Sequence, residues 1–275
     1  MNVDPISPAI GAEISGISLN PLPPADAIEA IYEALVRYKV IFFHDQDLSG
    51  QAQLDFASQF GEIDKPHAVY PHVDGLQQVT LLENDENRPP DTNAWHTDLT
   101  YYPNPPFASL LHARELPPTG GDTLWASMAA AYNALPDALK SEIEDLDAIH
   151  DPGTFRNQFA GEDKDVAALN EAMGRVGSAI HPVARTHPVS GERFLYVNRS
   201  FTEQILGYGS ADSARLLNYL FDHINQPEFQ IRPRWRKGDV VMWDNRITQH
   251  YAVADYSRYR RMHRVTIVND QRAPA

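Results

Sequence analysis

Two short His-x-Asp patterns are the residues of this sequence best suited to metal chemistry. They occupy residues 72–74, which read His-Val-Asp, and residues 96–98, which read His-Thr-Asp. In an extended strand, residues i and i+2 project to the same face, so each pattern can direct an imidazole and a carboxylate at one ion. Since the chain has 11 histidines in 275 residues, about one such pattern is expected by chance, and the surrounding sequence must separate the two.

The contexts of the two patterns differ. The first pattern runs into Gly75 among turn-forming residues, which is typical of a hairpin or loop. The second lies within residues 95–102, an aromatic and β-branched stretch that favours a strand edge beside an apolar cavity. The second pattern is therefore the candidate metal site.

His250 is the candidate for a third ligand, because it ends a polar loop that leaves a strand predicted at residues 239–243. Together, His96, Asp98 and His250 match the facial triad of non-haem Fe(II) oxygenases, which leaves positions open for a cosubstrate and O₂. Zinc is the competing ion, and a zinc hydrolase stays an alternative, although the sequence offers no residue as its general base. The chain has no cysteine, which excludes thiolate metal sites, disulfides and a cysteine nucleophile.

Two arginines near the end of the chain are candidates for anion binding. In a strand, Arg260 and Arg264 share one face, whereas Arg261 and His263 share the other. Two guanidiniums on one face can each bind a carboxylate or a sulfonate through paired donors. Surface salt bridges are the alternative role, which fits Arg258 and Arg261 better.

The overall charge limits the range of partners. The chain carries 23 basic and 37 acidic residues, a net charge of −14, which disfavours nucleic acid and anionic membranes as partners. Residues 231–275 are the exception, because they contain ten basic and four acidic side chains. The N-terminal residues do not resemble a signal peptide, and no apolar run reaches the roughly 18 residues of a membrane span. We therefore expect a cytoplasmic protein.

Hydrophobic patterning predicts the elements that must position these residues. Helices are predicted at Ala25–Tyr38, at 49–60 with Gly61 as the stop, from about Ser127, and at 211–224. Strands are predicted at 39–43, 78–82, 107–113, 122–125, 194–197, 239–243 and 262–268. Strands from distant parts of the chain, with helices between them, favour a β-sandwich or barrel with helices packed outside. We expect a single domain over residues 1–275.

Several motifs together resemble a known family, the Fe(II)/2-oxoglutarate-dependent dioxygenases of the taurine dioxygenase type. They are Trp-His-Thr-Asp at 95–98, Thr-Gly-Gly-Asp-Thr-Leu-Trp at 119–125, Thr-His-Pro-Val-Ser-Gly at 186–191, Trp-Asp-Asn-Arg at 243–246 and Thr-Gln-His-Tyr at 248–251. The resemblance implies a mainly β fold with flanking helices around a double-stranded β-helix, or jelly roll. It also implies Fe(II) bound by His96, Asp98 and His250, with 2-oxoglutarate and O₂ as cosubstrates.

The resemblance further implies which residues bind the organic molecules. Thr123 and Arg260 match the pair that meets the far carboxylate of 2-oxoglutarate. The substrate-binding residues that match are His67, Tyr70, the aromatic walls Phe159 and Phe201, and the sulfonate-binding Arg264.

The chain departs from the family at two points. It has Thr92 where taurine dioxygenases commonly carry an asparagine, which bears on the substrate. The interval from His250 to the arginines is one residue shorter than in the family. This leaves Arg261 as an alternative to Arg260 for binding 2-oxoglutarate, although the alternation of side chains along a strand favours Arg260.

The implied reaction is hydroxylation of the carbon next to a sulfonate, with taurine as substrate and sulfite, aminoacetaldehyde, succinate and CO₂ as products. One alternative is an alkylsulfate dioxygenase with the same iron core, and another is a non-catalytic jelly-roll protein that binds a small anion. Relatives of this type are commonly dimers or tetramers, so a homo-oligomer is expected by analogy.

Overall fold

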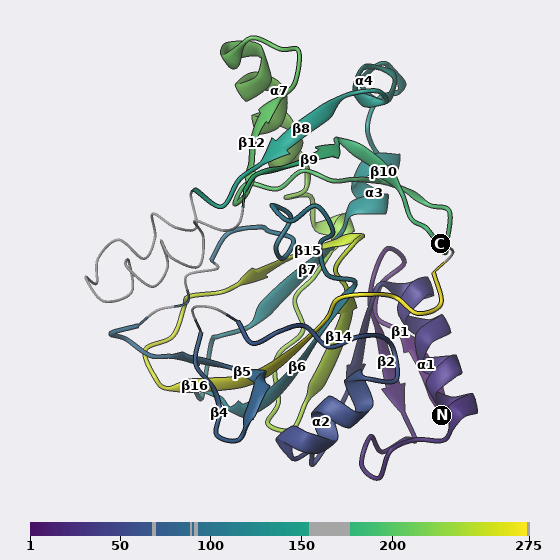
Figure 1. Ribbon diagram of the computed structural model, residues 1–275, viewed down its shortest axis with the longest axis vertical. Coiled ribbons are helices and arrows are strands. Elements are labelled where there is room, and N and C mark those ends of the chain that lie inside the picture. The colour runs from purple at the N-terminus through teal and green to yellow at the C-terminus, as the bar shows by residue number, and fades with distance from the viewer. Residues whose placement is uncertain (68–69, 89, 91–92, 154–176, 274–275) are drawn as a thin grey trace.

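A computed structural model describes residues 1–67, 70–88, 90, 93–153 and 177–273. The chain is mainly β, with a jelly-roll core and helices outside it, as predicted (Figure 1). The strands are β1 (Asn2–Pro5), β2 (Ala12–Ser15), β3 (Val40–Phe43), β4 (His72–Val73), β5 (Leu76–Asn84), β6 (Ala108–Glu115), β7 (Thr123–Ser127), β8 (Asp147–His150), β9 (Ala179–Pro182), β10 (Ala184–Thr186), β11 (Arg193–Leu195), β12 (Thr202–Ile205), β13 (Gln230–Ile231), β14 (Val240–Asp244), β15 (Thr248–Ala252) and β16 (Arg260–Ile267). The helices are α1 (Ala25–Tyr38), α2 (Gly50–Ala57), α3 (Met128–Asn133), α4 (Asp137–Ile143), α7 (Ser210–His223) and the short 3₁₀ helix η1 (Pro227–Phe229).

Two sheets form the part of the fold that carries the site. The major sheet has the order β1-β2-β3-β14-β6-β16-β5-β4, and the minor sheet has the order β13-β7-β15. The inner faces of both sheets meet around Trp125 of β7, whose ring lies 5.4 Å from that of Phe42 and 6.0 Å from that of Trp243. Strands far apart in the sequence therefore face each other across one apolar layer.

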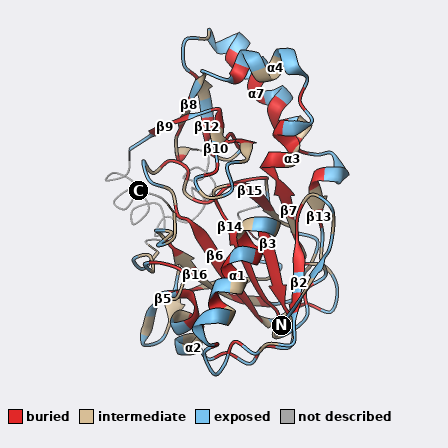
Figure 2. Cartoon of the chain, turned by 90° about the vertical axis from the view of Figure 1, so that its right-hand side faces the viewer, coloured by how far each residue is buried: buried red, intermediate tan, exposed pale blue. Residues whose placement is uncertain are grey.

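Helices α1 and α2 cover the outer face of the major sheet (Figures 1 and 2). Their apolar side chains pack against residues of β3, β14 and β16 that alternate with the inward-facing ones, as a pleated strand requires. Helices α3 and α7 pack instead against the small sheets β12-β8-β9 and β10-β11, around a separate cluster of buried side chains. In Figure 2, buried residues fill the centre of the sheets and the inward side of the helices.

The prediction that Gly61 stops helix α2 was wrong. The Ser49 hydroxyl accepts a hydrogen bond from the Ala52 amide at 3.1 Å and so caps the N-terminus. The helix ends at Ala57, before Gly61, so Gly61 does not stop it. A Cβ at position 61 would lie only 1.7 Å from the carbonyl oxygen of Asn269, so glycine is required there for a close approach of two backbones.

The residues around His250 also differ from the prediction. They form the strand β15, which pairs antiparallel with β7 and places His250 opposite Trp125. The predicted polar loop is limited to the short turn between β14 and β15. Among the described residues, no helix is long and apolar enough to span a membrane.

Candidate active site

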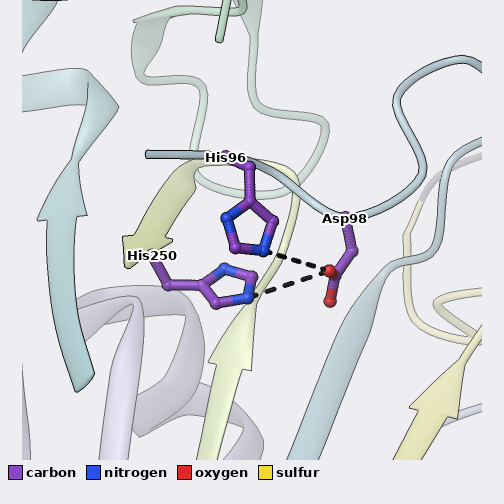
Figure 3. Close-up of side chains that lie close together, drawn as sticks. All are labelled: His96, Asp98 and His250. Atoms are coloured by element: carbon purple, nitrogen blue, oxygen red, sulfur yellow. Dashed lines mark ion pairs between the residues drawn. The ribbon is translucent and has the colours of Figure 1, made fainter. Parts of the chain in front are cut away.

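His96, Asp98 and His250 lie together in the interior of the protein (Figure 3). One ligand atom from each residue lies within 4.8 Å of the others, and all three residues are buried. The Nε2 atoms of both histidines lie 3.7 Å from Oδ1 of Asp98. Two imidazole nitrogens and one carboxylate oxygen are the donor set of a facial triad, so these residues fit Fe(II).

Backbone contacts hold the two ligand-bearing segments side by side. The amide of His96 donates to the carbonyl of His250 at 3.1 Å, and the amide of His250 donates back at 2.8 Å. The hydroxyl of Thr97, between the first two ligands, donates to the carbonyl of Thr248 at 2.8 Å. The predicted strand edge at residues 95–102 is thus a single bridge at His96, followed by a turn.

A hydrogen bond to the backbone determines that Nδ1 of His96 carries a proton. Nδ1 of His96 lies 2.8 Å from the carbonyl oxygen of Ala94, which can only accept. Nδ1 therefore carries a proton, and Nε2 is the ring nitrogen that faces Asp98.

Electrostatics favours the ligand forms of the other two residues. Burial lowers the pKa of His250 to about 3, helped by the charge of His96. Burial alone would raise the pKa of Asp98, but the charges of His250, Arg264 and His96 outweigh it and lower the value to about 2. At neutral pH the cluster holds a neutral imidazole at His250 and an ionised carboxylate.

Arg260, the residue that the sequence matches to 2-oxoglutarate, is 4% exposed and lies on the inner side of β16. Burial lowers its pKa, its Nε has no hydrogen-bond partner, and no ion pair involves it in the described part of the chain. A buried cation of this kind fits an incoming carboxylate. Arg261 lies on the other face and pairs with Glu115 at the surface, so the geometry favours Arg260 of the two.

Thr123 is buried on β7, two residues from the partner of His250. The indole Nε1 of Trp235 donates to its hydroxyl at 3.1 Å. That hydroxyl can therefore donate its own proton to a different acceptor, such as a carboxylate.

Arg264 lies at the metal cluster itself. Its Nη1 is 3.7 Å from Oδ1 of Asp98, its side chain is 11% exposed, and its Nε has no hydrogen-bond partner. The guanidinium carbon lies 5.8 Å from the centre of the Tyr70 ring. The structure thus brings Arg264 and Tyr70 together beside the candidate ligands.

His67 and Phe201 are the other described residues matched to the substrate. The ring of His67 lies 4.6 Å from that of Tyr70, and its Nδ1 accepts from the Tyr70 amide at 3.3 Å, which leaves the ring proton on Nε2. Burial and the charge of Arg264 lower the pKa of His67 to about 3, so it is neutral. Phe201 packs edge-on against Tyr101, with 5.0 Å between the ring centres.

Some sequence predictions fall elsewhere. Phe159 and Thr92 lie outside the described residues. The first His-x-Asp pattern, at residues 72–74, begins in β4 and turns at Gly75 into β5, so the predicted hairpin is confirmed.

The sequence interpretation missed four buried residues that contact the proposed site residues. They are Ser109, which donates to Oδ2 of Asp98 at 3.4 Å, Tyr101, Trp235 and Asn245. Asn245 lies within the motif at 243–246, and Tyr101 lies just after the motif at 95–98. Their place near these motifs was the only signal in the sequence that could have identified them.

Comparison with known proteins gives a consistent result. The family model for "Taurine catabolism dioxygenase TauD, TfdA family" matches residues 2–266. An alpha-ketoglutarate-dependent sulfate ester dioxygenase of Pseudomonas putida is 42% identical, over 98% of this chain and 90% of the relative. An alkylsulfatase of Acinetobacter baylyi is 36% identical, over 95% of this chain and 83% of the relative.

A solved structure agrees with these sequence matches. A taurine dioxygenase from Burkholderia xenovorans superimposes with a TM-score of 0.83 and 35% identity, covering 98% of this chain and 89% of that one.

Proposed function

Because the chain belongs to the taurine catabolism dioxygenase TauD, TfdA family, we propose that it hydroxylates an organic sulfate ester at the carbon that bears the sulfate oxygen. Enzymes of this family are 2-oxoglutarate-dependent dioxygenases that use Fe(II) and O₂, and 2-oxoglutarate is another name for alpha-ketoglutarate. The observation that carries the proposal is the buried cluster of His96, Asp98 and His250 beside the guanidinium of Arg264.

The residues divide into three roles. His96, Asp98 and His250 would hold Fe(II), which, when bound, supplies the oxidation that couples conversion of 2-oxoglutarate to succinate and CO₂ with hydroxylation of a C–H bond. Arg260 and the Thr123 hydroxyl would bind the far carboxylate of 2-oxoglutarate. This role accounts for the burial of a guanidinium that has no ion pair in the described part of the chain.

The third group would bind and orient the substrate. Arg264 presents paired donors to a three-oxygen anionic head, and neutral His67 lies against Tyr70 on the same side of the site. Tyr70 and Phe201, joined by Tyr101, supply aromatic surface for the rest of the molecule. Holding the head group fixes which carbon faces the metal, so orientation decides the site of hydroxylation.

Sulfate esters and sulfonates share this anionic head. The choice between these two substrate classes is therefore the more specific part of the proposal. Hydroxylation next to a sulfonate gives a product that collapses to an aldehyde and sulfite. Hydroxylation next to a sulfate ester gives an aldehyde and sulfate. The aromatic walls offer surface against which an apolar chain can pack. The two relatives at 42% and 36% identity are named for sulfate esters and alkyl sulfates.

The test is a panel of hexyl sulfate, hexanesulfonate and taurine, each given to the Fe(II)-loaded protein with 2-oxoglutarate and O₂. We expect sulfate and succinate in equal amounts from hexyl sulfate, at a higher kcat/KM than for either sulfonate. Sulfite release from taurine with the higher kcat/KM would reverse the assignment to the taurine activity expected from the sequence. Succinate formation with none of them, and no Fe(II) binding, would favour the non-catalytic anion-binding alternative.

A further inference from the structure

The turn between β14 and β15 contains a buried amide that touches the backbone of a proposed ligand. The side chain of Asn245 is fully buried. Its Oδ1 accepts a hydrogen bond from the backbone N–H of Asp98 at 3.0 Å, and its Nδ2 donates to the carbonyl oxygen of Asp98 at 3.1 Å. Nδ2 also donates to the carbonyl oxygen of Pro106 at 3.2 Å. These contacts fix the orientation of the amide, because one partner only donates and two only accept.

Asp98 lacks the support that a regular strand would provide. In the part of the chain that the structure describes, the backbone of residues 96–98 pairs with a neighbouring strand only at the His96–His250 bridge. The next residue, Leu99, has a φ of +56°, a left-handed conformation that costs a residue with a branched side chain about 1 kcal/mol or more. The two bonds from Asn245 act on the Asp98 backbone itself, and together with the side-chain bonds of Thr97 and Ser109 they oppose relaxation of this turn.

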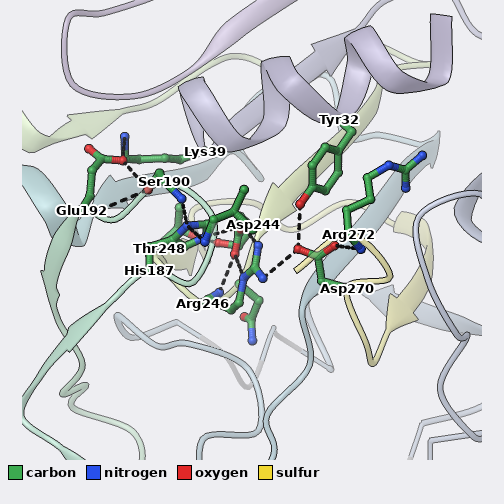
Figure 4. A network of polar contacts seen from close by, with 12 residues as sticks. Tyr32, Lys39, His187, Ser190, Glu192, Asp244, Arg246, Thr248, Asp270 and Arg272 are labelled. Carbon is green, nitrogen blue, oxygen red and sulfur yellow. Dashed lines mark hydrogen bonds and ion pairs between the residues drawn. The ribbon is translucent and has the colours of Figure 1, made fainter. Parts of the chain in front are cut away.

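The turn that carries Asn245 is itself rigid. Asp244, directly before it, is fully buried and accepts hydrogen bonds from Nε of Arg246 at 2.9 Å and from Nε2 of His187 at 3.0 Å (Figure 4). The hydroxyl of Thr248 donates to the Asp244 carbonyl at 2.8 Å. A side chain on this turn has a fixed position from which to hold another segment.

We propose that Asn245 is a positioning residue for the metal site: it holds the backbone of Asp98 so that the carboxylate faces both histidines. The inference rests on the proposed function, since it assumes that Asp98 is a metal ligand. Asparagine is specified chemically, because an ionised aspartate of the same shape would set an oxygen against two carbonyl oxygens instead of donating to them. Residues that orient metal ligands typically change metal affinity by about 10- to 100-fold when replaced.

The experiment compares metal affinity with stability in the full-length protein. Asn245→Asp keeps the shape and removes the two donated bonds, and Asn245→Ser is the smaller, milder change if the first variant does not fold. Gln53→Ala is the matched control, because Gln53 is also a fully buried amide that donates to two backbone carbonyls, those of Leu110 and His263, on the far side of the major sheet. Binding of Mn(II), as an oxidation-resistant probe, is measured by titration calorimetry, and unfolding of the metal-free protein by urea.

Both Asn245 variants should bind Mn(II) about 10- to 100-fold more weakly than wild type. Gln53→Ala should lose a similar amount of stability without a change in Mn(II) affinity. Equal Mn(II) affinity in wild type and the Asn245 variants would overturn the inference while leaving the proposed function intact. Failure of the wild-type protein to bind Mn(II) or Fe(II) would instead overturn the proposed function.

Discussion

At the scale of single residues, two arginines on the inner face of β16 are the proposed anion-binding residues. Arg260 and Arg264 are two pleats apart; Arg260 has no ion pair in the described part of the chain, and Arg264 lies 3.7 Å from the buried carboxylate of Asp98. Arg261 illustrates the contrast, because it lies on the outer face and pairs with Glu115. Alternation along one strand thus separates the two proposed binding residues from one that forms a surface ion pair.

Replacing the two arginines should therefore give different kinetic results. Arg260→Ala should raise KM for 2-oxoglutarate by about 10- to 100-fold, the cost of one lost charged hydrogen-bonding partner. Arg264→Ala should raise KM for the sulfur-containing substrate by a similar factor. Steady-state kinetics with each compound varied in turn would measure both. If the two effects were exchanged, the assignment of the arginines would be reversed.

Residue types predicted the candidate metal ligands but not the residues that contact them. His96, Asp98 and His250 were found because one of two His-x-Asp patterns lies in an aromatic, β-branched stretch and because the surrounding motifs resemble a known family. Asn245 escaped notice because its role depends on contact with Asp98, which is 147 residues away in the sequence. An amide has no such chemical signature, so only the folded structure reveals it.

At the scale of elements, the strand β15 shows why part of the fold was misjudged. Thr248, Gln249 and His250 are polar, which suggested a loop. In the structure they are buried, and two of their side-chain groups have partners: the Thr248 hydroxyl donates to the Asp244 carbonyl, and Nε2 of Gln249 donates to the Val197 carbonyl at 2.7 Å. Oε1 of Gln249 and Nδ1 of His250 have none among the described residues. Satisfied polar groups can lie inside a sheet at little cost, so hydropathy alone underestimated this strand. The helices with clear apolar periodicity, α1 and α7, were predicted to within one residue, whereas α4 was not predicted.

The loop before β7 depends on a glycine that packs against a binding residue. Gly121 has a φ of +73°, and a Cβ there would lie 3.2 Å from Cδ of Arg260. Gly121→Ala should raise KM for 2-oxoglutarate about fivefold by displacing this side chain. Gly75→Ala is the matched control, since Gly75 has a φ of +76° and open space around it. Both variants should lose about 1–2 kcal/mol of stability from the left-handed backbone, but a higher KM in the control too would exclude the contact as the cause.

A pair of histidines on neighbouring strands makes stability depend on pH. His112 of β6 lies opposite His263 of β16. Burial and the charge of Arg114 lower both pKa values from 6.5 to about 4. Between pH 6.5 and 4 the unfolded chain therefore binds more protons at these sites, and the free energy of unfolding falls as the pH falls through this window. This stability is fully present above pH 6.5.

Urea unfolding at several pH values would test this dependence. The double variant His112→Gln/His263→Gln should lose less stability than wild type between pH 6.5 and 4. If the double variant lost as much stability as wild type between pH 6.5 and 4, the two histidines would not be the cause of the pH dependence.

At the scale of the whole molecule, buried charge ties the C-terminal segment to helix α1 and to the turn after β14. Asp270 accepts hydrogen bonds from Nη1 of Arg246 at 2.8 Å and from the Tyr32 hydroxyl at 2.9 Å (Figure 4). Five of the ten basic residues in 231–275 form ion pairs with other described residues, some buried and some at the surface: Arg232, Arg246, Arg261, Arg264 and Arg272. The predictions of a single domain, a homo-oligomer and a cytoplasmic location stay predictions.

Removing this charge should destabilise the protein without touching the substrate. Asp270→Asn leaves Arg246 with one fewer buried counter-charge and should cost about 3 kcal/mol in unfolding free energy. Glu29→Gln is the control, because it breaks the pair between Arg272 and a half-exposed Glu29 and should cost less than about 1 kcal/mol. Chemical denaturation measures both. A loss in Asp270→Asn no larger than in the control would show that the buried network contributes little.

The wide separation of the paired segments along the chain also sets an order of events during protein synthesis. While the ribosome has made only the residues before His250, the emerging chain contains His96 and Asp98 but lacks the second imidazole. Asn245 is not yet in place, because its turn has not folded. Neither Arg260 nor Arg264 has been made. Such a pair has little hold on iron. A metal held by all three residues could therefore bind only after His250 has been made, which keeps a partly assembled, redox-active centre from forming before then.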